Sequence, residues 1–173
     1  MDLVLTVIGP DRPGLVETLS RLVTGHDASW EESRMARLAG RFAGVLRVRV
    51  DPGKALALTR ALEALGRGDL RVTVERVDAS PDSAGGRLLL LDFLGHDRPG
   101  IVHEVSAVLV EHGANVEELE TTVESAAMSG ERMFKARALV RVPEGLTVEV
   151  LDRELQAVAD ELMLDLHLDL HEE

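Results

Sequence analysis

Residues 95–102, Gly-His-Asp-Arg-Pro-Gly-Ile-Val, repeat residues 9–16, Gly-Pro-Asp-Arg-Pro-Gly-Leu-Val, at an offset of 86 positions. The same offset relates the pair Glu31-Glu32 to the pair Glu117-Glu118. A repeat at a fixed offset is the signature of a duplicated structural unit. We therefore expect the chain to fold as two copies of one small domain.

The boundaries of the two copies follow from composition. Residues 79–86 are rich in small and turn-forming residues and read as a linker between units at 1–78 and 87–173. The second copy is longer by six residues, which fit best in a turn at residues 125–132.

Each copy shows the same order of apolar patterns. An apolar run typical of a central strand, at residues 3–8 and 88–94, precedes a helix with one apolar stripe that stops near Gly25 or Gly113. Four further elements follow in each copy: a poorly alternating strand, a strand of period two, a second helix and a closing strand. In the first copy they are expected at residues 28–38, 42–50, 54–66 and 70–74, and in the second at residues 115–125, 134–142, 147–163 and 164–170.

This order predicts an α+β protein of two tandem ferredoxin-like βαββαβ units, each a four-stranded antiparallel sheet with two helices on one face. The poorly alternating strands at 28–38 and 115–125 are expected to be edge strands, bulged, or covered by a partner. Because one sheet face and the edges stay uncovered, we expect the units to pair, within the chain or across a homodimer.

Composition excludes several classes of protein. The chain has no cysteine, which removes disulfides, thiol catalysis and zinc–thiolate sites, and no apolar run long enough to span a membrane. Its start lacks the basic segment of a signal peptide, so a cytoplasmic protein is expected. The net charge of −12 argues against direct binding to nucleic acid.

The charge is uneven along the chain. Residues 1–80 carry 12 Lys and Arg against 11 Asp and Glu, whereas residues 81–173 carry 7 against 20. Two interpretations remain open for the acidic second half, namely a solvated surface or a docking face for a basic partner.

The repeated motif lies where the first strand meets the first helix. Gly9 and Gly95 permit close backbone approach, and the motif aspartates and prolines are expected at the helix N-cap and first turn. Gly14 and Gly100 place no side chain in that turn, so its backbone N–H groups can bind a carboxylate. A purely structural turn, preserved by duplication, is the alternative.

The βαββαβ order with the Gly-x-Asp-Arg-Pro-Gly motif resembles the ACT domain, an amino-acid-sensing module, over nearly the whole chain. Two such units without a catalytic domain are similar to the glycine cleavage system transcriptional repressor family. That resemblance implies a non-catalytic regulator that acts through a transcription activator instead of binding DNA.

The ACT resemblance implies a small amino acid as ligand, with glycine or serine as candidates. Its site would combine the Asp before Arg-Pro-Gly with an Asn at the start of the second strand, usually between two paired units. The second copy has Asp97 and Asn115, whereas the first has Asp11 and Ser29, which puts binding by the first copy in doubt. The resemblance implies these ligand-binding residues: Gly95, His96, Asp97, Arg98, Pro99, Gly100, Ile101 and Asn115, and in the first copy Gly9, Asp11, Arg12, Pro13, Gly14, Leu15 and Ser29.

Two other functions stay open beside sensing. One is a regulatory subunit of an amino-acid or one-carbon enzyme, and the other is an interaction module whose ligand site is vestigial. No nucleophile with a base, phosphate loop or zinc-hydrolase motif is present, so neither catalysis nor a cofactor is expected. The adjacent carboxylates Glu117-Glu118 are expected on opposite strand faces, which makes them poor acid–base partners.

Histidines give the remaining candidates. Asp165, His167, Asp169 and His171 alternate along the last strand, a spacing that suits a divalent metal, although a solvated strand face is favoured. His26 and His112 follow the first helices and are expected to cap helix carbonyls.

Overall fold

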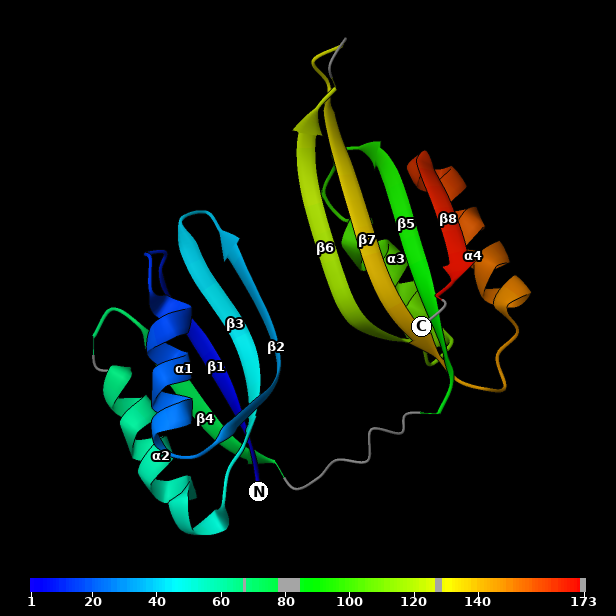
Figure 1. Ribbon diagram of the computed structural model, residues 1–173. Helices are drawn as coiled ribbons and strands as arrows, with labels where there is room; N and C mark the ends of the chain where they lie inside the picture. The colour runs from blue at the N-terminus through cyan, green and yellow to red at the C-terminus, as the bar shows by residue number, and fades with distance from the viewer. Residues whose placement is uncertain (67, 78–84, 127–128, 172–173) are drawn as a thin grey trace. The chain divides into compact units, whose positions relative to one another are not determined.

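The computed structural model describes residues 1–66, 68–77, 85–126 and 129–171, and its contacts separate into two compact units, Met1–Pro81 and Asp82–Glu173. The predicted linker lies largely outside the described residues. Both units have the predicted βαββαβ order (Figure 1). The elements are β1 (Asp2–Pro10), α1 (Leu15–Gly25), β2 (Ser29–Leu38), β3 (Arg41–Arg49), α2 (Pro52–Leu65), β4 (Arg71–Val77), β5 (Arg87–His96), α3 (Ile101–Glu111), β6 (Asn115–Ser125), β7 (Arg132–Val142), α4 (Val148–Leu162) and β8 (Leu164–Leu170).

Each unit is a four-stranded antiparallel sheet with two helices on one face (Figure 1). The strand orders are β2-β3-β1-β4 and β6-β7-β5-β8. In each unit the first strand therefore lies inside the sheet, and the last strand lies beside it at one edge. The fold class predicted from the repeat is therefore confirmed.

The core of each unit lies between its sheet and its helices. Every second residue of the central strand points inward, and these side chains, such as Leu3 and Leu5 or Leu89 and Leu91, are fully buried. The helices contribute their predicted stripes, for example Leu19 and Val23 from α1. Burial of these aliphatic side chains, at roughly 25 cal/mol per Å² of apolar area, provides the main stabilisation.

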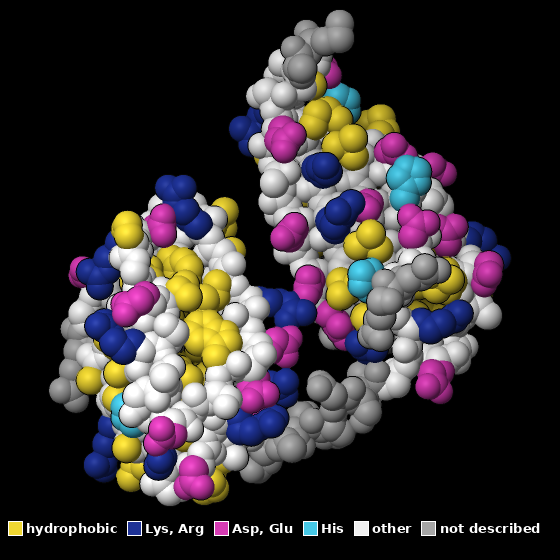
Figure 2. Space-filling model, in the orientation of Figure 1, with side chains coloured by type: hydrophobic (Ala, Val, Ile, Leu, Met, Phe, Trp, Pro, Cys, Tyr) yellow, Lys and Arg dark blue, Asp and Glu magenta, His cyan; other side chains and the backbone are white. Residues whose placement is uncertain are grey.

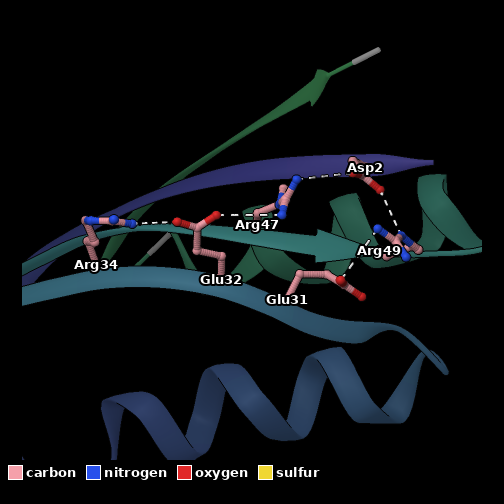
Figure 3. A network of polar contacts seen from close by, with 6 residues as sticks. All are labelled: Asp2, Glu31, Glu32, Arg34, Arg47 and Arg49. Carbon is pink, nitrogen blue, oxygen red and sulfur yellow. Dashed lines mark hydrogen bonds and ion pairs between the residues drawn. The ribbon is translucent and has the colours of Figure 1, made fainter. Parts of the chain in front are cut away.

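The poorly alternating strands β2 and β6 are edge strands, and both are bulged, at Glu31 and Glu117. A bulge inserts one extra residue and resets the alternation of side chains, which explains the irregular pattern. The expectation that Glu117 and Glu118 point to opposite strand faces is wrong for this reason, since Glu117 is bonded to Arg141 and Glu118 lies opposite Leu139, both on the face away from the helices. The first unit shows the same arrangement. Glu31 pairs with Arg49 at 3.5 Å and Glu32 with Arg47 at 3.6 Å, on the face of the sheet opposite the helices (Figure 3).

The ladders also locate the difference in length between the copies. Leu38 pairs with Arg41 in the first hairpin, whereas Glu124 pairs with Met133 in the second. The extra residues therefore lie between Glu124 and Met133, in the predicted turn, of which residues 127–128 are outside the described part.

Candidate functional site

The motif forms a turn between the first strand and the first helix of each unit. Gly14 and Gly100 occupy the N-cap positions with φ of +88° and +99°, a conformation that favours glycine. The N–H of Glu104 donates to the carbonyl of Gly100 at 2.9 Å and closes the first helical turn of α3. The N–H groups of residues 101–103 have no carbonyl acceptor within the helix, and they point away from its N-terminal end. This end of α3 can therefore accept an anion.

The predicted helix positions of the motif aspartates and of the motif prolines are both wrong. Asp11 and Asp97 are not N-caps, since neither glycine cap has a side-chain hydrogen bond, and Pro13 and Pro99 lie before the helices. The reason is geometric: the chain needs a left-handed residue to enter the helix, and only the motif glycine adopts it at little cost.

Both aspartates instead tie the motif turn to the neighbouring hairpin. The backbone N–H of Asp97 donates to the carbonyl of Arg132 at 2.9 Å, and the Asp97 carboxylate pairs with the Arg132 guanidinium at 2.9 Å. In the first unit, the backbone N–H of Asp11 donates to the carbonyl of Gly40 at 3.0 Å, and the Asp11 carboxylate pairs with the Arg37 guanidinium at 2.6 Å. The arginines are 70% exposed, so each unit presents an Asp–Arg ion pair to solvent beside a helix N-terminus.

Sequence reasoning missed Arg37 and Arg132. Both lie in or beside the hairpin that joins the second and third strands, far along the chain from the motif. The two arginines are not at equivalent positions, because Arg37 is on β2 and Arg132 begins β7. The repeat alignment therefore carried no signal that would have paired them with the aspartates.

The first motif glycine is required by packing, as predicted. A Cβ atom on Gly95 would lie 2.4 Å from Leu164 Cδ2 and 3.1 Å from the carbonyl oxygen of Met163. On Gly9 it would lie 2.9 Å from Leu70 Cδ1 and 3.0 Å from the carbonyl oxygen of Asp69. This part of the motif serves the fold whatever the ligand.

The other motif residues divide between structure and surface. Leu15 and Ile101 are buried in the cores, while Arg98 donates to the carbonyl of Glu161 at 3.4 Å, near the end of α4. His96 is exposed, and its Nδ1 lies 4.0 Å from the Glu131 carboxylate. Arg12 is exposed at the start of the first turn.

Asn115 lies at the other end of the sheet from Asp97. Asn115 begins β6 and pairs with Arg141 on β7, whereas Asp97 is bonded to Arg132 at the start of β7. Nine residues of strand separate these two points, which is about 30 Å at 3.3 Å per residue. Ser29 and Asp11 are separated in the same way. One unit cannot bring both predicted groups to one small ligand.

The histidines after the helices have structural contacts. His26 Nδ1 lies 2.8 Å from the carbonyl oxygen of Leu22, as expected of a helix cap. His112 instead contacts the carboxylate of Glu154 on α4 at 2.8 Å and ties the two helices of its unit together. The prediction of carbonyl capping is therefore confirmed for His26 only.

The alternating pattern on β8 forms a solvated face. His167 Nε2 lies 3.3 Å from Asp165, and both side chains are at least 70% exposed. Within the described residues, no three His, Asp or Glu side chains come together in a way that could hold a metal ion. Among these residues, no helix has the length and apolar character needed to cross a membrane.

Two tandem units with this topology and this motif define an ACT-domain protein, and the chain belongs to the ACT-domain family, which matches residues 1–75 and 87–169. The glycine cleavage system transcriptional repressor of Escherichia coli (strain K12) is 23% identical over 161 residues, which is 92% of this chain and 85% of the repressor.

Two solved structures share the two-unit architecture. An unknown protein from Galdieria sulphuraria is 31% identical, with a TM-score of 0.87 over 99% of this chain and 98% of that one. A putative glycine cleavage system transcriptional repressor is 20% identical, with a TM-score of 0.75 over the same shares, and it supports the fold alone. The chain is thus an ACT-domain regulatory protein related to the glycine cleavage repressor.

Proposed function

We propose that this protein is a non-catalytic sensor that binds a small amino acid at the second unit and passes that state to a protein partner. The observation that carries the proposal is the solvent-facing ion pair of Asp97 and Arg132 beside the open N-terminus of α3. An amino acid is a zwitterion, so it needs one acceptor for its ammonium and donors for its carboxylate. Asp97 supplies the first, and Arg132 with the N–H groups of α3 supplies the second.

The distance between Asp97 and Asn115 favours a site shared by two copies of the chain. When two β6 edges pair antiparallel, the beginning of one strand lies beside the end of the other. Asn115 of the second copy would then approach the hairpin end, where Arg132 holds Asp97. A pair of second units would form two complete sites, each with an amide to orient the ligand.

An uncovered apolar stripe supports pairing at this edge. Val116, Leu119 and Val123 are 37%, 46% and 43% exposed, although they lie on the helix side of β6. In the first unit Ser33 and Arg37 stand where the second has Leu119 and Val123. Exposed apolar side chains in a row mark surfaces that another protein covers, and this row is stronger in the second unit.

We expect Leu119→Lys together with Val123→Lys to abolish a dimer, because both charges would be buried at the shared edge. Sedimentation velocity measures the result: the parent sediments as a dimer and the variant as a monomer. Ser33→Lys, at the corresponding place in the first unit, is the matched control and leaves the dimer intact. A parent that is monomeric at micromolar concentration contradicts the shared site.

The ligand itself is tested by calorimetric titration of the full chain with glycine, serine and the other common amino acids. The proposal predicts saturable binding of one small amino acid, with one site per chain. Absence of binding by every amino acid would favour an interaction module, since Arg132 already neutralises Asp97 without a ligand. Because the related protein is named as a transcriptional repressor, a protein of transcription control is the first candidate partner, and an enzyme of amino-acid or one-carbon metabolism is the second.

A further inference from the structure

The sheet face opposite α3 and α4, here called the outer face of the second unit, is uncovered by any described element of that unit (Figure 1). Cross-strand register places Leu88, Leu90 and Leu94 of β5 on this face, together with Leu139 of β7. Leu94 is 42% exposed, and the other three leucines are partly exposed. Four leucines in contact with water on one sheet face call for a covering partner.

The first unit differs in polarity at two of these four positions, since Val4 and Ile8 stand where the second unit has Leu90 and Leu94. Asp2 and Arg47 stand where the second unit has Leu88 and Leu139. In the first unit these residues belong to a chain of alternating charges that crosses the outer face (Figure 3): Arg34, Glu32, Arg47, Asp2, Arg49 and Glu31. Arg34 donates a hydrogen bond that holds the pKa of Glu32 below its usual range, so Glu32 is ionised in this network. The outer face of the first unit also has exposed apolar side chains, Ile8 and Val45, but charged residues cross it where the second unit has Leu88 and Leu139.

Carboxylates surround the leucines of the second unit. Asp165 and Asp169 flank them on β8, and Glu120 and Glu124 flank them on β6. Figure 2 shows apolar side chains on this face with acidic, basic and histidine side chains between and around them. The cations on the face are Lys135, Arg137 and Arg141.

Two of these cations are already held by carboxylates. Asp92 accepts two hydrogen bonds from Arg137, at 2.8 and 3.1 Å, and raises the pKa of that arginine. Arg141 is bonded to Glu117. The face therefore carries a surplus of negative charge around its leucines, with the Asp92–Arg137 ion pair between them.

Three shallow hollows lie on this face, with volumes of 180, 290 and 220 Å³. Leu94 and His167 line the first, Leu88 and Arg141 the second, and Glu120 and Lys135 the third. The first and third lie between side chains of neighbouring strands, and the second lies where β5 begins and β8 ends.

We propose that the outer face of the second unit docks an amphipathic helix of the protein partner, whose apolar stripe is bracketed by lysines or arginines. The inference rests on the proposed function only in assuming that a protein partner exists. A helix is the element that ordinarily covers an open sheet face. A second copy is disfavoured as occupant, because like faces would bring their carboxylates together and the chain carries −12.

The spacing sets the pattern of the helix. The outermost strands of a four-stranded sheet are about 14 Å apart, at 4.8 Å per strand. Arginines about eleven positions apart on a helix lie on one face and about 16 Å apart, within reach of both acidic margins. Leucines about four and seven positions after the first arginine fall between them on the same face.

The probe is a synthetic helical peptide with this arrangement, titrated into the ¹⁵N-labelled full chain. We expect saturable shifts of amides on β5, β7 and β8. Leu139→Arg lowers the affinity at least about tenfold, since it puts a cation at the centre of the contact. The fold accepts this change, because Arg47 occupies the equivalent position in the first unit. Val45→Arg, on the exposed outer face of the first unit, leaves the affinity unchanged.

Three results would overturn the proposal: shifts that map to the first unit, equal binding of a peptide with Glu in place of Arg, or unchanged affinity in Leu139→Arg. Amino-acid calorimetry on Leu139→Arg separates this inference from the sensing proposal. Docking that is lost while amino-acid binding is retained supports the outer face as an independent surface. Docking in a chain that binds no amino acid leaves the outer face supported and removes the ligand site.

Discussion

Asp97→Ala weakens binding of the amino acid by roughly 10- to 100-fold, because it removes a charge-assisted contact that contributes about 1.5–3 kcal/mol. Asp11→Ala has a smaller effect, since the proposed site belongs to the second unit and the first unit has Ser29 in place of the orienting amide of Asn115. Titration calorimetry on both variants, with whichever amino acid binds the parent, measures the difference.

The control for Asp97→Ala is its stability. The Asp97–Arg132 pair is largely exposed at its arginine, and such pairs contribute roughly 0–1 kcal/mol to folding. The variant should therefore unfold close to the parent in urea, so that a loss of affinity reports on the ligand. Equal losses in Asp11→Ala and Asp97→Ala would show that the second unit is not the preferred site.

Gly95→Val destabilises the second unit by roughly 3 kcal/mol, because its side chain must displace Leu164 and crowds the carbonyl of Met163. Gly100→Ala costs less, about 1 kcal/mol, since its added Cβ has open space and only the positive φ opposes it. Urea unfolding followed by circular dichroism gives both values. A Gly95→Val variant as stable as the parent contradicts the packing role of this glycine.

Together these two experiments divide the motif by role. Gly95 is required by the sheet and Gly100 by the entry into the helix, so duplication preserves both without any ligand. Asp97 is different, because its ion pair is exposed and the turn retains its backbone hydrogen bond to Arg132 without it. Its side chain is the part of the motif that the fold needs least.

The fold was predictable because the apolar patterns of its strands and helices are local and occur in both copies of the repeat. Alternating residues such as Leu3 and Leu5 lie in the sheet as their period requires, and helix stripes such as Leu19 and Val23 face it. The repeat confirmed each element by its second copy. The edge strands β2 and β6 were recognisable because the alternation of apolar and polar residues breaks down at the same position of the repeat in both copies.

The site was less predictable because it depends on contacts between distant segments. The ion pair of Asp97 and Arg132 joins residues 35 positions apart, and no spacing rule connects them. Asp97 was predicted as the helix N-cap because aspartate is preferred there. The N-cap is Gly100 instead, because the chain enters α3 through a left-handed residue. The separation of Asp97 from Asn115 appeared only with the strand register.

The most direct test of the shared site is to mix Asp97→Ala with Asn115→Ala chains and measure amino-acid binding by calorimetry. Each variant alone should bind weakly, because both sites of its dimer lack one group. Mixed dimers contain one intact site, with Asp97 from one chain and Asn115 from the other, so random exchange should restore about a quarter of the parental sites at parental affinity. If mixing restores no high-affinity binding although exchange is complete, the two residues do not serve one site, and the account of the shared site is wrong.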